Sequence, residues 1–199
     1  MEKNIAEGKA AAKSNPRALI FDPCGYATLG LAGLCESELE SQVIGTPQTL
    51  PHFLELMIES KPDMVICGID PRANVLPQLL NMPYYPSCRY VLLTDAESVA
   101  LSRALQTAGF YAVIDKSMPL LKLTGVLRQA LVNPSRGNIR RNARFYLPEE
   151  RYILGALLNG DRLALIARKM GIPYRTVSRY KHTALRRAGL KSINQILSA

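Results

Sequence analysis

Residues 17–132 alternate between two kinds of apolar pattern, and this alternation is the feature that most restricts the fold. Short apolar runs typical of strands, such as 17–22, 63–69 and 89–95, are separated by stretches with helical spacing of their apolar residues. In 50–60, apolar side chains recur three and four positions apart, as on one face of a helix. About five strand–helix alternations predict a doubly wound α/β domain around a parallel sheet.

The same patterns set the expected order of elements. They predict strands at 17–22, 42–45, 63–69, 89–95 and 111–115, and helices at 26–39, 50–60, 98–110 and 120–132. Residues 1–16 lack the apolar core of a signal peptide, and we expect them to form a flexible tail. No apolar run approaches the roughly 20 residues of a bilayer span. We therefore expect a cytoplasmic protein with no membrane contact.

The charge of the chain is distributed unevenly. Residues 1–138 carry 12 basic and 13 acidic side chains, whereas residues 139–199 carry 13 basic and 3 acidic ones. All of the net charge of +9 therefore comes from the last third of the chain. A basic excess of this size on a short segment predicts a module that binds nucleic acid.

The four cysteines argue against a metal site. Cys24, Cys35, Cys67 and Cys88 show no C-x-x-C spacing and have no histidine cluster beside them. We expect reduced, mostly buried thiols, and neither a metal nor a cofactor. The chain also lacks a nucleophile–base pairing or a phosphate-cradling glycine loop, which argues against an ordinary metabolic enzyme.

The basic segment has the pattern of a helix-turn-helix. It follows a predicted linker at 133–146, rich in Pro, Gly, Ser, Asn and Arg, and occupies 147–199. Helices are predicted at 148–160, at 163–172 and at 174–190, with a tight turn after the second. Two short helices joined in this way, the second basic, are typical of DNA-binding proteins.

The third of these helices has two contrasting faces. The apolar face, expected to pack inward, carries Val177, Ala184, Leu185 and Ala188. The opposite face carries Arg175, Ser178, Arg179, His182 and Arg186, whose side chains include donors for guanine edges. The flanks carry Thr176, Tyr180, Lys181 and Arg187, which suit phosphate contacts. For His182 a core position or a metal site is the alternative, but no ligand partners stand at helical spacing.

The last predicted helix, 192–197, repeats apolar side chains at Ile193, Ile196 and Leu197. This small face could complete the core of the domain, or it could pair with a second copy as a dimer face. The pattern leaves both interpretations open.

Several spaced motifs run through the basic segment in one register. They are P-x-E-R at 148–151, Gly160, I-A-x-x-M-G-I at 166–172, R-T-V at 175–177 and L-R-x-x-G-L at 185–190. On these motifs the segment resembles the C-terminal DNA-binding domain of LuxR/NarL-family regulators. The resemblance implies four helices, with the third in the major groove and the fourth commonly dimerising. It places base contacts at Ser178, Arg179 and His182. We expect Arg175 and Arg186 to contact the DNA backbone instead.

Residues 17–132 resemble the receiver domain that is often fused to such a DNA-binding domain. A working receiver has an acidic pair after the first strand, an aspartate at the end of the third, a hydroxyl after the fourth and a lysine after the fifth. The acids hold Mg²⁺, the aspartate attacks phosphorus, and the hydroxyl and lysine stabilise the phosphoryl charge.

Only part of this set is present. Thr94 and Lys116 supply the hydroxyl and the lysine, Asp22 is the one acid of the pair, and Gly68 stands at the acceptor position. Asp70 lies two residues further on, displaced by ~6.6 Å along an extended strand, whereas reacting atoms must lie within ~3–3.5 Å. We therefore expect a site that does not accept phosphate, with Asp70 in a turn. Thr94 and Lys116 are then surface remnants or, alternatively, a retained anion pocket.

These patterns predict an atypical response regulator that binds double-stranded DNA. We expect it to act independently of aspartyl phosphorylation, as a homodimer or as a heterodimer with another response regulator. Residues 22–33 are similar to auxiliary regulators of capsule or fimbriae in enteric bacteria. The alternatives are a regulator phosphorylated on a displaced aspartate, and an inhibitory partner of another regulator that does not act through DNA.

Overall fold

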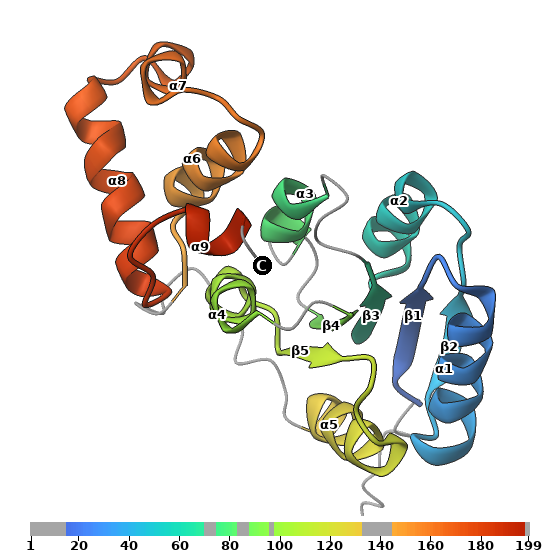
Figure 1. The fold of residues 1–199 in the computed structure, drawn as a ribbon. Helices are drawn as coiled ribbons and strands as arrows, with labels where there is room; N and C mark the ends of the chain where they lie inside the picture. Colours follow the sequence, from blue (N-terminus) through green and yellow to red (C-terminus); the bar gives the residue numbers. More distant parts are fainter. Residues whose placement is uncertain (1–14, 70–74, 83–87, 96–97, 133–144, 198–199) are drawn as a thin grey trace, which may run out of the picture.

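The chain forms an α/β domain and a helical domain that lie against each other (Figure 1). This computed structural model describes residues 15–69, 75–82, 88–95, 98–132 and 145–197. The predicted tail at 1–16 and the predicted linker at 133–146 fall almost entirely outside these ranges. Asp70 also falls outside them, so its predicted turn stays a prediction.

A parallel sheet forms the centre of the α/β domain, which confirms the predicted fold class. Its strands are β1 (Arg17–Phe21), β2 (Gln42–Gly45), β3 (Met64–Gly68), β4 (Arg89–Thr94) and β5 (Ala112–Asp115). Their order in space is β2-β1-β3-β4-β5. The direction of winding therefore reverses between β1 and β3, and in such sheets the crevice at the carboxyl ends of these two strands is the usual binding site.

Helices cover both faces of the sheet (Figure 1). They are α1 (Gly25–Glu38), α2 (Leu50–Ser60), α3 (Leu76–Asn81), α4 (Val99–Ala108) and α5 (Leu120–Val132). Strand side chains alternate between the faces. Ile20 and Ile66 pack in the core beneath α1 and α5, whereas Leu19 and Val65 pack in the core beneath the other helices. Helix α3 was not predicted.

The helical domain contains the predicted helix-turn-helix. Its helices are α6 (Pro148–Leu158), α7 (Leu163–Met170), α8 (Tyr174–Arg187) and α9 (Asn194–Leu197). Helix α6 begins with a proline, which lacks the N–H that has no partner at a helix start, and the Leu147 amide donates to the Glu150 carboxylate at 2.8 Å. Helix α7 ends at Gly171, whose φ of 65° makes the turn to α8.

The two domains share one apolar core. The cluster beneath α2, α3 and α4 continues through Leu80 and Ala108 into Leu154, Ala184 and Ile196 of the helical domain. Helix α6 packs against α3, and α9 packs against α4 (Figure 1). Within the described residues, no helix is both long and apolar enough to span a bilayer.

Candidate nucleic-acid interface

Helix α8 places its apolar side chains as the sequence predicts. Val177, Ala184 and Leu185 are buried, and Ala188, which follows the helix, is buried as well. Val177 packs in a small core that α6 and α7 complete with Ile153 and other apolar residues. The opposite face of α8 must therefore point away from the domain.

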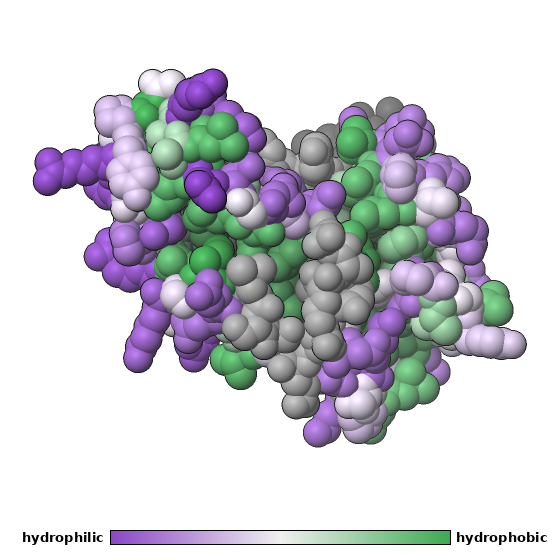
Figure 2. Space-filling model, turned by 45° about the horizontal axis from the view of Figure 1, so that its top comes forward, coloured by the Kyte–Doolittle hydropathy of each residue, from purple (hydrophilic) through white to green (hydrophobic). Residues whose placement is uncertain are grey.

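That outer face is cationic and open to solvent. Arg175, Arg179, His182 and Arg186 are all exposed, and Ser178 is half-buried between them. Figure 2 shows hydrophilic side chains projecting from the outer edge of the helical domain. A 14-residue helix with a row of guanidinium groups on its free side has the length and charge to lie in a major groove. We call this row of five residues the α8 face.

The predicted phosphate contacts on the flanks of α8 differ in their surroundings. Thr176 and Lys181 are half-buried beside the α8 face. Tyr180 is also half-buried, and its ring packs against the small core around Val177. Tyr180 therefore stabilises the packing of α8 on the small core, and it also lies beside the predicted contact surface.

Arg187 has a structural partner inside the domain. Its Nε lies 3.0 Å from a carboxylate oxygen of Glu150, a side chain with no exposed surface. Because a buried carboxylate needs a paired cation, Arg187 stabilises the packing of α6 on the end of α8. Arg187 therefore has a structural role inside the domain, and its predicted contact with the DNA backbone stays a prediction.

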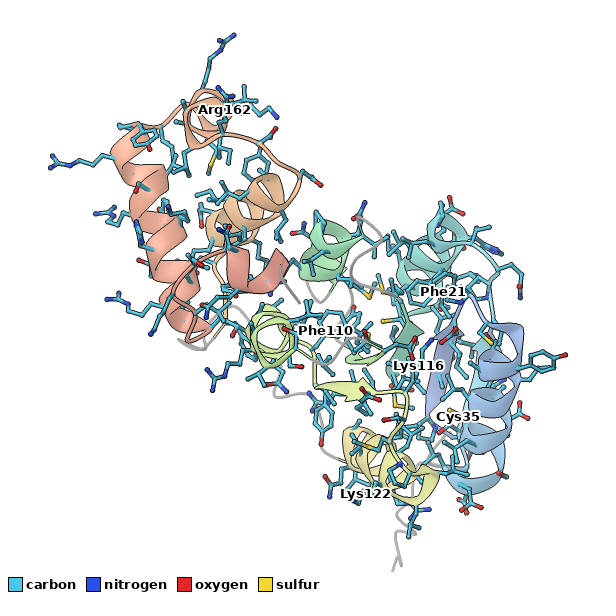
Figure 3. All side chains as sticks on the ribbon, in the orientation of Figure 1. Phe21, Cys35, Phe110, Lys116, Lys122 and Arg162 are labelled. Atoms are coloured by element: carbon cyan, nitrogen blue, oxygen red, sulfur yellow. The ribbon has the colours of Figure 1, made fainter. Side chains whose placement is uncertain are left out.

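Further cations lie on α7, where the sequence gave no motif for DNA contact. Arg162 stands at the N-terminal end of α7, in the part of the domain where α7 lies beside the start of α8 (Figure 3). Arg162 and Arg168 are both exposed. Lys169 instead forms an ion pair with Asp161 at 2.7 Å, and this hydrogen bond raises the pKa of the lysine. The local excess of arginine was the sequence signal that could have marked Arg162 and Arg168 as further candidates for DNA contact.

The predicted dimer face on α9 is occupied within the chain. Ile196 is buried in the core that α4 shares with the helical domain, and Ile193 packs against that core. Leu197 ends the helix, and its side chain lies outside the described set. Ile193 and Ile196 therefore contribute to a core within the chain, and pairing of this face with a second copy stays a prediction.

The receiver-like residues meet at the crevice between β1 and β3. Asp22 follows β1, Gly68 ends β3, and Lys116 follows β5 (Figure 3). The Asp22 carboxylate is almost fully buried, with Oδ2 3.0 Å from Lys116 Nζ and Oδ1 accepting from the Cys24 amide at 2.8 Å. The ammonium group therefore neutralises a carboxylate that the fold has removed from water.

The absence of a side chain at Gly68 makes room for this carboxylate. A Cβ built on Gly68 would lie 1.6 Å from Asp22 Oδ2, far inside van der Waals contact. Asp22 thus occupies the space that any side chain at position 68 would need.

Thr94 is not a surface remnant. It ends β4, it is buried, and its carbonyl accepts from the Lys116 amide at 3.0 Å. The prediction of a surface position is wrong for Thr94, because β4 lies inside the sheet, where Thr94 pairs with Asp115 of β5. Lys116 itself is partly exposed, and its Nζ also lies 3.8 Å from the exposed carboxylate of Asp95.

Metal-ligand clusters are not found in the described part of the chain, where no three His, Cys, Asp or Glu side chains are placed to share an ion. The cysteines there are all free thiols, with Cys35, Cys67 and Cys88 buried and Cys24 exposed.

Comparison with known proteins gives a fold relationship. No family model and no curated protein sequence matches the chain. Among solved structures, RcsB from Salmonella enterica serovar Typhimurium bound to the promoter rprA matches with a TM-score of 0.52 and 18% identity, over 92% of this chain and 97% of that one. A chain from the structure of two RcsB dimers bound to two parallel DNAs matches with a TM-score of 0.53 and 17% identity, over 92% of this chain and 97% of that one. At such identities the likeness concerns architecture, and the chain has the two-domain fold of these response regulators.

Proposed function

We propose that the protein is a DNA-binding transcription regulator that reads its site with the α8 face. The observation that carries this proposal is the division of α8 into a buried apolar side and an open cationic side. Val177 and Leu185 hold the helix in its domain, while Arg175, Arg179 and His182 project outward. RcsB structures bound to DNA have the same overall fold.

We further propose that the α/β domain works without aspartyl phosphorylation. The acceptor position is a glycine, and the neighbouring space is filled by Asp22 in an ion pair with Lys116. A phosphoryl group and Mg²⁺ would both need this space and this lysine. The domain then acts through contacts with other proteins, as a homodimer or beside another response regulator.

In vitro selection of bound DNA with the purified full-length chain tests DNA binding and assembly together. A two-fold symmetric site would support a homodimer, because symmetric operators mirror symmetric proteins. A single half-site would support action beside another regulator. If no sequence is enriched, and the double variant Arg179→Ala, His182→Ala regulates as the natural chain does, the protein acts as an inhibitory partner and not through DNA.

Acetyl phosphate with Mg²⁺ tests the second part of the proposal. We expect no stable gain of mass on the intact protein. A gain that Asp70→Asn or Asp22→Asn abolishes would instead assign phosphorylation to a displaced aspartate. The similarity of residues 22–33 to auxiliary regulators suggests control of fimbriae or other surface structures, and transcript profiling of cells with and without the gene would test it.

A further inference from the structure

Helix α4 ends with carbonyl groups that have no partner within the helix. Gly109 adopts a left-handed conformation, and the amides of Gly109 and Phe110 return to the carbonyls of Gln106 and Leu105. This leaves the carbonyls of the last two helical residues, Thr107 and Ala108, pointing out of the helix end.

These carbonyls are bonded by the helical domain and by the residue pair that leads into it. The Tyr146 amide donates to the Thr107 carbonyl at 3.1 Å, and Arg151 Nη2 donates to the Ala108 carbonyl at 2.5 Å. The C-terminal cap of α4 is therefore completed by Arg151 of the helical domain and by Tyr146, which immediately precedes that domain.

Arg151 also reaches a second helix end. Its Nη1 donates to the Leu80 carbonyl in the last turn of α3 at 2.6 Å. Arg151 is 2% exposed, and its guanidinium group lies between two helix C-termini, each of which carries partial negative charge. One planar cation thus joins α6 to both helices of the α/β domain that face it.

The packing around this contact is close. Gly155, one turn further along α6, is buried, and a Cβ built on it would lie 3.7 Å from the Pro77 side chain of α3. Ile196 of α9 is also buried, in the core that α4 shares with the helical domain. Helix α8 runs along the edge of the helical domain, beyond α6 as seen from α3 (Figure 1).

We propose that Arg151 is a positioning residue that locks the two domains into one unit, with α8 held in a fixed orientation relative to the sheet and with α9 withheld from other chains. The proposal does not depend on the identity of the DNA site. Under this proposal, a protein that binds the α/β domain and displaces α3 or α4 would change the orientation of α8.

Amide hydrogen exchange on the full-length chain tests the proposal, because the Tyr146 amide is bonded across the interface. Arg151→Met keeps the length of the side chain but cannot donate. We expect it to speed exchange at Tyr146 and Ile196 by roughly tenfold or more, since losing a charged hydrogen bond costs at least a decade in an opening equilibrium. Amides of α7, such as that of Ile166, should keep their natural rates. Arg151→Lys should give an intermediate effect.

A matched control is Arg128→Met, which removes an arginine that donates to the Glu38 carbonyl within the α/β domain. It should leave Tyr146 exchange unchanged. Equal acceleration throughout α6, α7 and α8 in Arg151→Met would make Arg151 a residue of the helical core and would overturn the proposal. Unchanged exchange at Tyr146 would overturn it as well.

A second variant opens the interface without altering Arg151. Gly155→Leu places a large side chain between α6 and α3, and it should also speed exchange at Tyr146. Its control, Gly155→Ala, adds a methyl group that meets Pro77 only at van der Waals distance and should have little effect. If Gly155→Leu leaves Tyr146 protected, the two domains are not locked through this face.

Discussion

At Gly68, the space that a side chain would fill is occupied by the carboxylate of Asp22. The backbone of β3 leaves an open space at position 68, and the Asp22 carboxylate lies in it at ion-pair distance from Lys116. The buried carboxylate is tolerated because its charge is paired and its second oxygen accepts from the Cys24 amide. The charge of the Asp22 carboxylate is therefore balanced within the chain by Lys116.

Gly68→Asp should lower the free energy of unfolding by roughly 2–4 kcal/mol. The new side chain collides with Asp22 and places a second carboxylate beside it. Adding Asp22→Ala to this variant should restore most of the loss, and denaturant unfolding measures both effects. The control is Gly30→Ala, on an exposed site with no atom near the added Cβ, where stability should be unchanged or up to about 1 kcal/mol higher. Wild-type stability in Gly68→Asp would show that Asp22 is not held in this space.

The thiols should differ sharply in reactivity. Burial raises the pKa of Cys35 to about 11 and of Cys88 to about 12, and it also raises that of Cys67. We expect a thiol reagent at pH 8 to titrate one group in the folded protein, Cys24, and four after unfolding. Cys24→Ser should leave none reactive in the folded state, and rapid modification of that variant would contradict the burial of the other three.

These raised pKa values also set a pH dependence. An unfolded thiol ionises near 9.0, whereas folded Cys35 stays protonated until about pH 11. The folded state therefore binds more protons between these values. Stability should fall as the pH rises through this window.

Helix α8 combines a structural side and a recognition side in one element. Its buried residues determine its rotation within the domain, and that rotation decides which arginines point outward. The spacing of apolar residues was sufficient to predict both sides, since Val177, Ala184 and Leu185 are all buried. What the spacing could not predict was the pairing of Arg187 with Glu150, because the two residues belong to different helices.

Arg179→Ala should cost roughly 1–3 kcal/mol of DNA-binding free energy and relax selectivity at one base position, if the contact is bidentate. The matched control is Arg128→Ala, which removes an arginine that is also exposed, from α5 in the α/β domain. Binding measured on the selected site and on single-base variants of it distinguishes a base contact from a phosphate contact. Uniform weakening on every sequence would make Arg179 a phosphate contact instead.

Helix α3 shows where sequence patterns fail at the level of elements. It has six residues, with a proline at its start, and lies in a region rich in Pro and Tyr. Such a stretch is too short to display helical periodicity. Its buried leucines pack in a core that includes the sheet and α4, and the helix also packs against α6, about 70 residues further along the chain.

The whole molecule is electrostatically divided, with the excess positive charge in its helical domain. We expect the DNA affinity to fall steeply as salt rises, because several arginine and lysine side chains would displace counterions from the phosphates. Titrations at several salt concentrations measure the slope. Arg175→Ala and Arg186→Ala should each reduce that slope by about one unit if each contacts one phosphate. An affinity independent of salt would contradict DNA binding through this surface.

The sequence by itself determined what depends on near neighbours along the chain. Alternating apolar runs predicted the five strands and most helices, the basic last third predicted the helix-turn-helix, and Gly68 led to the prediction of a site that does not accept phosphate. Each of these signals is carried by residues within one turn or one strand of each other, where backbone geometry sets which side chains share a face.

Only the tertiary structure decided what depends on residues far apart. The strand order brought Asp22 beside Gly68 and Lys116, and the docking of α6 brought Arg151 to the ends of α3 and α4. Whether a charge is exposed or buried in an ion pair follows from such encounters, because desolvation depends on every group around it. Local patterns of residues contain no record of those surroundings.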